Sequence, residues 1–177
     1  MTTARVAETG LVRAARTGDE AAFDALVGPL IDLAFKLALV ILRDRYEAED
    51  AVQEATIKAW QNLNRLRDES AVRQWFLAIV ANHCRTVRRG RWWSLIRLGV
   101  TDRSDYETGD QTESRLDLRQ KVAQLPPTDR AALFLFFYLD LPLTEAARIL
   151  QITPQAAKSR VHRAVTKLRL EMLEVQT

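Results

Sequence analysis

The stretch LTEAARILQITPQAAKSRVHRAVTKLR, residues 143–169, indicates the fold more clearly than any other part of the chain. Thr144 suits the N-cap of a short helix, and residues 151–152 fit a tight turn after it. Thr153 and Pro154 then suit the cap and the first turn of a second, longer helix. A short helix, a tight turn and a second helix form the helix-turn-helix pattern.

The second predicted helix of this stretch has an apolar side and a basic side. At about 100° per residue, its apolar residues gather on one side, where they should be buried. These residues are Ala157, Val161, Ala164, Val165, Leu168 and Met172. The other side carries no acid and holds long cations, an amide and hydroxyls. Its members are Gln155, Lys158, Ser159, His162 and Arg163, with Arg160 on the flank.

Side chains of this kind suit DNA. Arginine and lysine can donate to the major-groove edge of guanine or to phosphates, and glutamine can pair with adenine. The N-terminus of a helix adds backbone N–H groups and a positive dipole end for a phosphate. An ordinary solvated helix face is the alternative interpretation. The helix-turn-helix framework and the acid-free outer side favour DNA.

Helical spacing of apolar residues continues through the rest of the chain, and no stretch has a convincing strand pattern. Residues 131–139 are apolar almost throughout, so periodicity alone leaves helix and strand open there. A start at Thr128 and the lack of a partner strand favour a helix. We therefore expect an all-α fold. Candidate N-caps before the helix-turn-helix are Asp19, Asp44, Ser70 and Thr128.

Other residues indicate where elements bend or end. Pro29 should kink a helix, and Gly90 is a plausible helix stop. Residues 1–9 look like a short loose tail, and the segment after the tryptophans of the first half lacks sustained periodicity. We expect two small helical domains, residues 10–93 and 115–173, joined by a flexible linker over residues 94–114, with the C-terminal domain a helix-turn-helix.

Charge is distributed unevenly along this chain of 177 residues, although the formal net charge is only +3. All charged residues within 85–97 and within 148–169 are basic, whereas acids cluster within 102–117. Two basic patches around an acidic segment suggest an extended anionic partner that is contacted twice. Solvated faces around a solvated linker explain the same pattern, so charge alone leaves both interpretations open.

The single cysteine, Cys84, rules out an internal disulfide and suggests a reduced, intracellular setting. The N-terminus has no apolar core of signal-peptide length. The longest uninterrupted apolar runs, near 37–42 and 131–139, are far shorter than the roughly 20 residues that cross a bilayer. We expect a cytoplasmic protein without membrane insertion.

Arginines in the first predicted domain are bracketed by aromatic residues. Trp75-Phe76 precede the basic run RTVRRGR at 85–91, and Trp92-Trp93 follow it. Arginines can follow a phosphate backbone while exposed aromatic rings stack on unpaired bases. This combination suits single-stranded or opening DNA. At their helical spacing, Trp75 and Phe76 also fit a core, and at least one of them should be buried.

Acids at three- and four-residue steps lie on one side of another predicted helix: Glu47, Asp50 and Glu54. Carboxylates at this spacing could hold a divalent metal if a second acidic set faced them. The remaining acids of the domain are scattered, and His83 and Cys84 have no partner at ligand spacing. A protein-docking surface or a plain solvated face fits better. We expect no catalytic residues, no metal site and no cofactor, and hence no enzyme.

Three segments together resemble a known family. They are EAEDAVQEATIKAW at 47–60, WFLAIVANHCRTVRRGRWW at 75–93 and LPPTDRAALFLFFYLDLPLTEAARILQITPQAAKSRVHRAVTKLR at 125–169. Their order and separation resemble the extracytoplasmic-function (ECF) branch of bacterial sigma factors, the smallest sigma factors, which keep only conserved regions 2 and 4. The resemblance covers about residues 10–172.

The resemblance implies a promoter-specificity subunit of RNA polymerase, with promoter DNA and core polymerase as partners. Region 2 of the family docks on the clamp of the largest polymerase subunit, and region 4 lies near the flap. The docking face corresponds to Asp50, Gln53 and Glu54. The surface that melts and captures the minus-ten element corresponds to Asn64, Arg73, Trp75, Asn82, Arg85, Arg88 and Arg89. The surface for the minus-thirty-five element corresponds to Gln155, Lys158, Ser159, Arg160, His162 and Arg163.

Two positions depart from the family pattern. The tight turn often carries glycine where this chain has Gln151, and the first helix of the motif reads LTEAA. Both changes keep apolar positions such as Leu150 and Ile152, so the motif should still fold. No sensory domain is expected after Thr177, and regulation by an anti-sigma protein is therefore implied. The alternative function is a conventional helix-turn-helix regulator with an N-terminal interaction domain.

Overall fold

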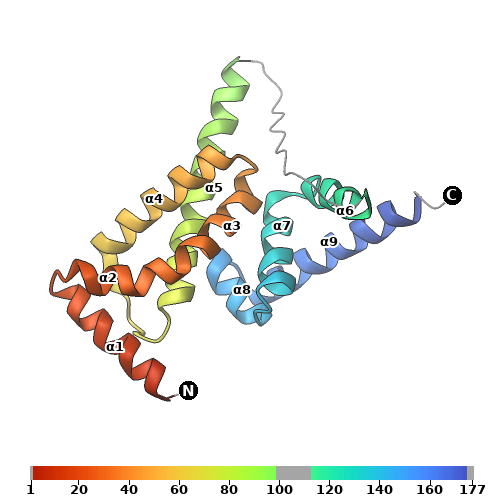
Figure 1. Cartoon of the computed structure of the whole chain (residues 1–177). Coiled ribbons are helices and arrows are strands. Elements are labelled where there is room, and N and C mark those ends of the chain that lie inside the picture. Colours follow the sequence, from red (N-terminus) through yellow and green to blue (C-terminus); the bar gives the residue numbers. More distant parts are fainter. Residues whose placement is uncertain (1, 99–112, 175–177) are drawn as a thin grey trace.

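The computed structural model describes the backbone of residues 2–98 and 113–174, and side chains over residues 8–90 and 118–173. Every regular element in the described residues is helical, which confirms the all-α prediction (Figure 1). The N-terminal half, residues 2–98, contains α1 Thr2–Arg16, α2 Glu20–Val27, η1 Gly28–Leu30, α3 Ile31–Leu42, α4 Arg45–Asn62, η2 Leu63–Arg65 and α5 Val72–Leu98. The C-terminal half, residues 113–174, contains α6 Glu113–Ala123, α7 Pro127–Leu133, η3 Phe134–Tyr138, α8 Leu143–Leu150 and α9 Pro154–Glu174.

Several predicted helix boundaries are confirmed by side-chain caps. The Asp19 carboxylate accepts from the backbone N–H of Ala22 at 3.0 Å, and the Asp44 carboxylate accepts from that of Glu47 at 2.9 Å. Thr153 Oγ1 accepts from the backbone N–H of residue 156 at 3.1 Å at the start of α9. Each oxygen satisfies an N–H group that the first helical turn leaves without a partner.

Three other predicted caps are wrong. The Ser70 hydroxyl donates to the carboxylate of Asp68 at 2.7 Å, and α5 starts two residues later. The helices predicted to start at Thr128 and Thr144 instead follow Pro126 and Pro142, which stand at their N-caps. Pro126 and Pro142 are extended, with ψ of 136° and 145°, and each helix begins at the next residue, before its threonine.

The ends of the N-terminal half are more helical than predicted. Residues 2–16 form α1 rather than a loose tail, and α5 continues through Gly90 to Leu98. Residues 94–98 of the predicted linker are therefore helical, as are residues 113–114 at the start of α6. The rest of that linker, with most of its acidic cluster, lies outside the described residues, as do the side chains of Trp92 and Trp93. Pro29 lies in the 3-10 turn between α2 and α3, where a kink was predicted.

The core joins the two halves. Phe76, Leu37 and Leu77 are fully buried in the N-terminal half, and Leu135 and Ile149 of the C-terminal half belong to the same buried cluster. Helix α7 packs against α3, and α8 packs against α5. Figure 1 shows α8 and α7 beside α5 and α3, so the C-terminal half packs directly on the N-terminal half.

The segment Glu20–Leu42 is long and apolar enough to cross a membrane by length and composition alone. Its apolar character is not one uninterrupted run in the sequence, because Gly28 and Pro29 interrupt it. In the fold, Phe23 and Leu37 from this segment lie in the protein core. A buried core helix of a globular protein satisfies the same criteria, so the segment is weak support for membrane insertion.

Candidate nucleic-acid and protein-docking interfaces

Helix α9 presents the basic side that the sequence predicted. Gln155, Lys158, Ser159 and His162 are all exposed, while Ala157 is fully buried against the core. The predicted apolar side loses contact with the core toward the helix end, since Met172 is half exposed. The first two turns of α9 therefore form a solvent-facing surface of donors and amides, held in place by small apolar residues beneath.

Arg163 has a second role that the sequence analysis missed. Its Nε and Nη2 atoms donate to Asp129 of α7 at 2.7 and 2.9 Å, and Asp129 is only 2% exposed. A buried carboxylate requires a partner, and this bidentate bond also raises the pKa of Arg163 above its usual value. Arg163 thus ties α9 to α7 and lies at the edge of the basic side. The sequence shows the acid, Asp129 in PPTDR, but no local pattern indicates that its partner lies 34 residues later.

Arg160 points away from the main basic side, as its flank position predicted. Together with Arg85 and Arg88 of α5, it lines a small cavity between the two halves. Burial, followed by the charges of Arg160 and Arg89, lowers the pKa of Arg85. Arginines from both halves therefore approach one another at the junction, where their like charges repel.

The predicted minus-ten residues lie mainly along α5, and the helix divides them into two groups. At about 100° per residue, Trp75, Asn82, Arg85 and Arg89 fall on one strip of α5, which we call the α5 strip. Arg73 falls on the opposite side of the helix, Arg88 lies between, and Asn64 lies before the helix in η2. Trp75 is half-buried against the core, and its neighbour Phe76 is completely buried.

Arg85 is the most constrained member of the α5 strip. Its Nη1 atom donates to the backbone carbonyl of Leu150 at 2.9 Å, and Nη2 donates to Gln151 Oε1 at 3.0 Å. A longer bond of 3.3 Å joins Nη2 to Asn82 on the same helix. Arg85 therefore contacts the turn of the helix-turn-helix, a contact between residues 65 apart that sequence reasoning did not foresee.

Helix α4 carries the predicted docking face on its exposed side. Asp50, Gln53 and Glu54 are all exposed, and their three- and four-residue steps place them next to one another. Gln53 also lines an open groove of about 680 Å³ between α3 and α4. The acidic face is thus continuous with a concave surface that the sequence analysis did not predict.

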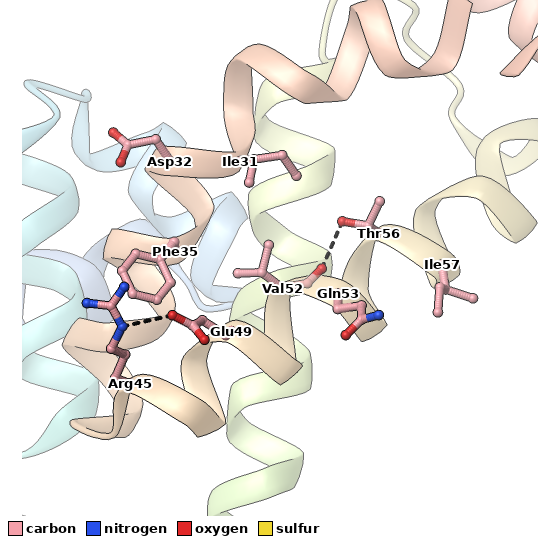
Figure 2. Close-up of a pocket in the computed structure, with 9 residues that line it drawn as sticks. All are labelled: Ile31, Asp32, Phe35, Arg45, Glu49, Val52, Gln53, Thr56 and Ile57. Atoms are coloured by element: carbon pink, nitrogen blue, oxygen red, sulfur yellow. Dashed lines mark hydrogen bonds and ion pairs between the residues drawn. The ribbon is translucent and has the colours of Figure 1, made fainter. Parts of the chain in front are cut away.

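The surface of this groove is mostly apolar, and Figure 2 shows Ile31, Phe35, Val52 and Ile57 there together with charged side chains such as Asp32, Arg45 and Glu49. Ile31 and Ile57 are 36% and 45% exposed, so both present apolar surface to solvent. The Arg45 guanidinium lies 5.9 Å from the centre of the Phe35 ring and donates to Glu49 at 2.9 Å. An apolar floor with a charged rim is typical of a protein-docking surface. In the sequence, Ile57 lies close to Asp50 and Glu54 of α4, and this apolar residue beside acids was a sign of the groove.

Cys84 and His83 are titratable residues outside the surfaces described above. Burial raises the pKa of the Cys84 thiol to about 12, so the thiol stays protonated. His83 Nδ1 lies 2.6 Å from Lys58 Nζ. Among the residues that the structure describes, no three His, Cys, Asp or Glu side chains are placed to hold a metal ion.

Family models match both halves of the chain. Residues 26–94 match sigma-70 region 2, and residues 115–168 match sigma-70 region 4. Together these two matches cover more than half of the sequence and follow the order of the two halves in the fold.

Curated relatives extend the similarity over nearly the full length. The chain is 31% identical to the ECF RNA polymerase sigma factor SigL of Mycobacterium tuberculosis, over 90% of this chain and 96% of SigL. It is 30% identical to the RNA polymerase sigma-H factor of Pseudomonas aeruginosa, over 87% of this chain and 88% of that protein.

Solved structures share the fold at lower identity. The sigma factor RpoE of Bartonella quintana, solved with the anti-sigma factor NepR, aligns with a TM-score of 0.75 at 23% identity, over 85% of this chain and 96% of RpoE. CnrH, solved with the cytosolic domain of CnrY, aligns with a TM-score of 0.69 at 22% identity, over 97% of this chain and 99% of CnrH.

Proposed function

This chain belongs to the ECF RNA polymerase sigma factors, and from that membership we propose how its surfaces divide the work of promoter-specific initiation. It binds core RNA polymerase and directs it to promoter DNA, and it acts as an initiation factor rather than as a catalyst. Its place of action is the cytoplasm. The observation that carries this function is the succession of regions 2 and 4 along one chain, each with an exposed surface of the required chemistry.

The acidic face of α4 docks on core polymerase. Asp50, Gln53 and Glu54 are exposed on adjacent turns, so a basic or amide-rich helix of the polymerase clamp can pair with them. The neighbouring apolar groove would receive the side chains of the same partner, and Ile57 at its edge supports this assignment. Charged residues at the rim then set orientation, while the groove supplies most of the binding energy.

The basic side of α9 reads the minus-thirty-five element as a duplex. Gln155, Lys158, Ser159 and His162 are exposed on the first turns of α9, which enter the major groove in helix-turn-helix proteins. Arg163 anchors the helix through Asp129, and its side chain is still 64% exposed and can reach a phosphate. Arg160 on the flank has the geometry for a backbone contact.

The α5 strip and η2 capture the minus-ten element. Trp75 is only half-buried and can offer part of its ring for base stacking, and Arg85 and Arg89 follow it along the helix for phosphates. Asn64 and Asn82 supply hydrogen-bonding groups for exposed bases, whereas Arg73 and Arg88 lie off the strip and suit flanking phosphates. The two functional domains are residues 10–93 and 115–173, joined by residues 94–114.

Control by an anti-sigma protein is the regulatory part of this proposal. Two proteins of the same fold, RpoE of Bartonella quintana and CnrH, were solved in complexes with NepR and with CnrY. The α3–α4 groove offers this chain an apolar surface that an inhibitor could share with polymerase. Competition for one surface would make the two partners mutually exclusive.

Reconstituted transcription tests the function as a whole. Core polymerase, this protein and a library of promoter fragments are combined, and transcripts are sequenced from their starts. We expect transcripts that depend on the protein and share sequence elements near positions minus ten and minus thirty-five. Transcription equal to that of core polymerase alone would overturn the proposed function.

A further inference from the structure

The connection between α4 and α5, residues 63–71, holds the proposed minus-ten residue Asn64 and ends just before another, Arg73. Two of its residues are anchored in the core, since Leu63 and Leu66 are only 3% and 4% exposed. Its exposed hydrogen-bond donors are Asn64, Arg65 and Arg67. The conformation of this connection therefore decides where these donors point.

Helix α1 holds the connection through Arg16, its last residue. Arg16 Nη1 donates to Glu69 Oε1 at 2.6 Å, and Arg16 Nη2 donates to the backbone carbonyl of Leu66. These bonds join residues that are 53 and 50 positions apart, and α1 packs against η2 beside the connection (Figure 1). One guanidinium therefore fastens the connection at two points, a side chain and a backbone carbonyl.

A second arginine of α1 approaches the same carboxylate more loosely. Arg13 Nε lies 3.6 Å from Glu69 Oε2, and the side chain of Arg13 is 74% exposed, against 25% for that of Arg16. Exposed ion pairs contribute little to stability, because water and salt screen them. Arg16 is therefore the main contact, and Arg13 offers a matched comparison on the same helix.

The backbone that carries Arg16 is firmly placed. Val12 is fully buried and Ala15 is 4% exposed in the core, so the apolar side of α1 is held against the rest of the N-terminal half. Directly after Arg16 the chain turns at Gly18, whose φ is 97° and whose N–H donates to the Ala15 carbonyl at 3.1 Å. The guanidinium is therefore presented from a fixed position.

The contact with Arg16 also reduces an unfavourable charge near the proposed DNA surface. The connection carries two acids, Asp68 and Glu69. Asp68 Oδ1 accepts from the backbone N–H and the hydroxyl of Ser70 at 3.0 and 2.7 Å, whereas Glu69 pairs with Arg16. A carboxylate beside DNA repels phosphates. Pairing Glu69 with Arg16 therefore favours the approach of an anionic strand to Asn64.

We propose that Arg16 is a positioning residue for the minus-ten surface: through Glu69 and Leu66 it holds residues 63–71 in the conformation that captures the DNA strand, without contacting DNA itself. This inference rests on the proposed function for the identity of the strand. A segment that is already ordered loses less conformational freedom on binding, and binding is tighter as a result. Helix α1 thereby takes part in promoter opening.

Hydrogen exchange of the free full-length protein, followed by mass spectrometry, tests the ordering. The backbone N–H groups of Leu66 and Ala71 donate to carbonyls within the connection at 3.1 and 3.0 Å, so their exchange reports its conformation. Arg16→Ala should speed exchange there about tenfold, as expected for the loss of a charge-assisted hydrogen bond. Exchange in α4 should stay the same, and Arg13→Ala should exchange like wild type.

Promoter opening by the reconstituted holoenzyme tests the link to DNA. The probe is a promoter selected in the transcription experiment above, with a fluorescent adenine analogue in its minus-ten element that brightens when the bases unstack. Arg16→Ala should reduce opening about tenfold, while binding to core polymerase and to a duplex with only the minus-thirty-five element stays at the wild-type level. Arg16→Lys keeps the charge and a donor for one acceptor, so it should recover part of the opening.

Three outcomes would overturn the positioning role. The first is exchange in Arg16→Ala that matches wild type, and the second is faster exchange with unchanged opening. The third is an equal loss of opening and of minus-thirty-five binding, because that result indicates general damage to the fold. Failure of the proposed function differs from all three: the wild-type protein itself would open no promoter, and the role of Arg16 in minus-ten capture would fall with it.

Discussion

Asp129 of α7 and Arg163 of α9 form a bidentate ion pair in which the carboxylate is almost fully buried and the guanidinium is largely exposed. The pair restrains the rotation of α9 about its axis, because Arg163 leaves the helix directly after His162, among the residues proposed to read DNA. The orientation of the recognition surface therefore depends on an acid outside the helix-turn-helix itself.

Arg163→Ala should destabilise the protein measurably, because it leaves the Asp129 carboxylate buried without its partner. Urea unfolding followed by circular dichroism measures this change. Arg163→Lys is the matched control, since it keeps the charge but loses the bidentate geometry, and it should cost less. Wild-type stability in Arg163→Ala would contradict the anchoring role.

Lys158→Ala should leave the free energy of unfolding within about 0.5 kcal/mol of wild type, because the side chain is exposed. Use of the minus-thirty-five element should weaken by about 1–3 kcal/mol if Lys158 contacts a base. Competition between promoters with intact and altered upstream elements measures the effect. Equal preference in wild type and variant would remove Lys158 from the reading surface.

Asp50→Ala should weaken binding to core polymerase by about 1 kcal/mol or more while promoter preference stays the same. Fluorescence anisotropy of labelled protein with core polymerase gives the affinity. Glu20→Ala removes an exposed acid from α2, away from the docking face, and serves as the control. The assignment of α4 to docking would be contradicted by equal losses in both variants.

His83 should make stability depend on pH. Burial and the neighbouring Lys58 charge lower the pKa of His83 below its ordinary 6.5. The unfolded chain then binds a proton more readily than the folded chain. The free energy of unfolding should therefore have its full value above about pH 6.5 and fall as the pH drops below it. Urea unfolding at several pH values measures this, and His83→Gln should reduce the slope. A slope of opposite sign would contradict the environment seen for His83.

Local signals in the sequence explain why some elements were predicted correctly. Asp19, Asp44 and Thr153 cap helices through bonds to residues three positions later, so a short window contains all the necessary information. Gly90 was misread as a stop because a glycine is tolerated inside a helix when the flanking residues favour it. The exposed side of α9 followed from periodicity alone.

Contacts between distant residues explain what the sequence could not provide. Asp129, the partner of Arg163, is 34 residues away, and Leu150 and Gln151, the partners of Arg85, are 65 and 66 residues away. No spacing rule connects such pairs, because the first depends on how α7 packs against α9 and the second on how α8 packs against α5. The α3–α4 groove was missed for the same reason, since Ile31 and Ile57 come together only in the fold.

The central claim, that this chain directs polymerase to promoters, is tested most directly by transcription reconstituted from purified core polymerase and the purified protein. We expect transcripts whose start sites share paired upstream elements, and we expect these transcripts to disappear when either element is scrambled. Start sites that are unchanged by adding the protein would contradict it.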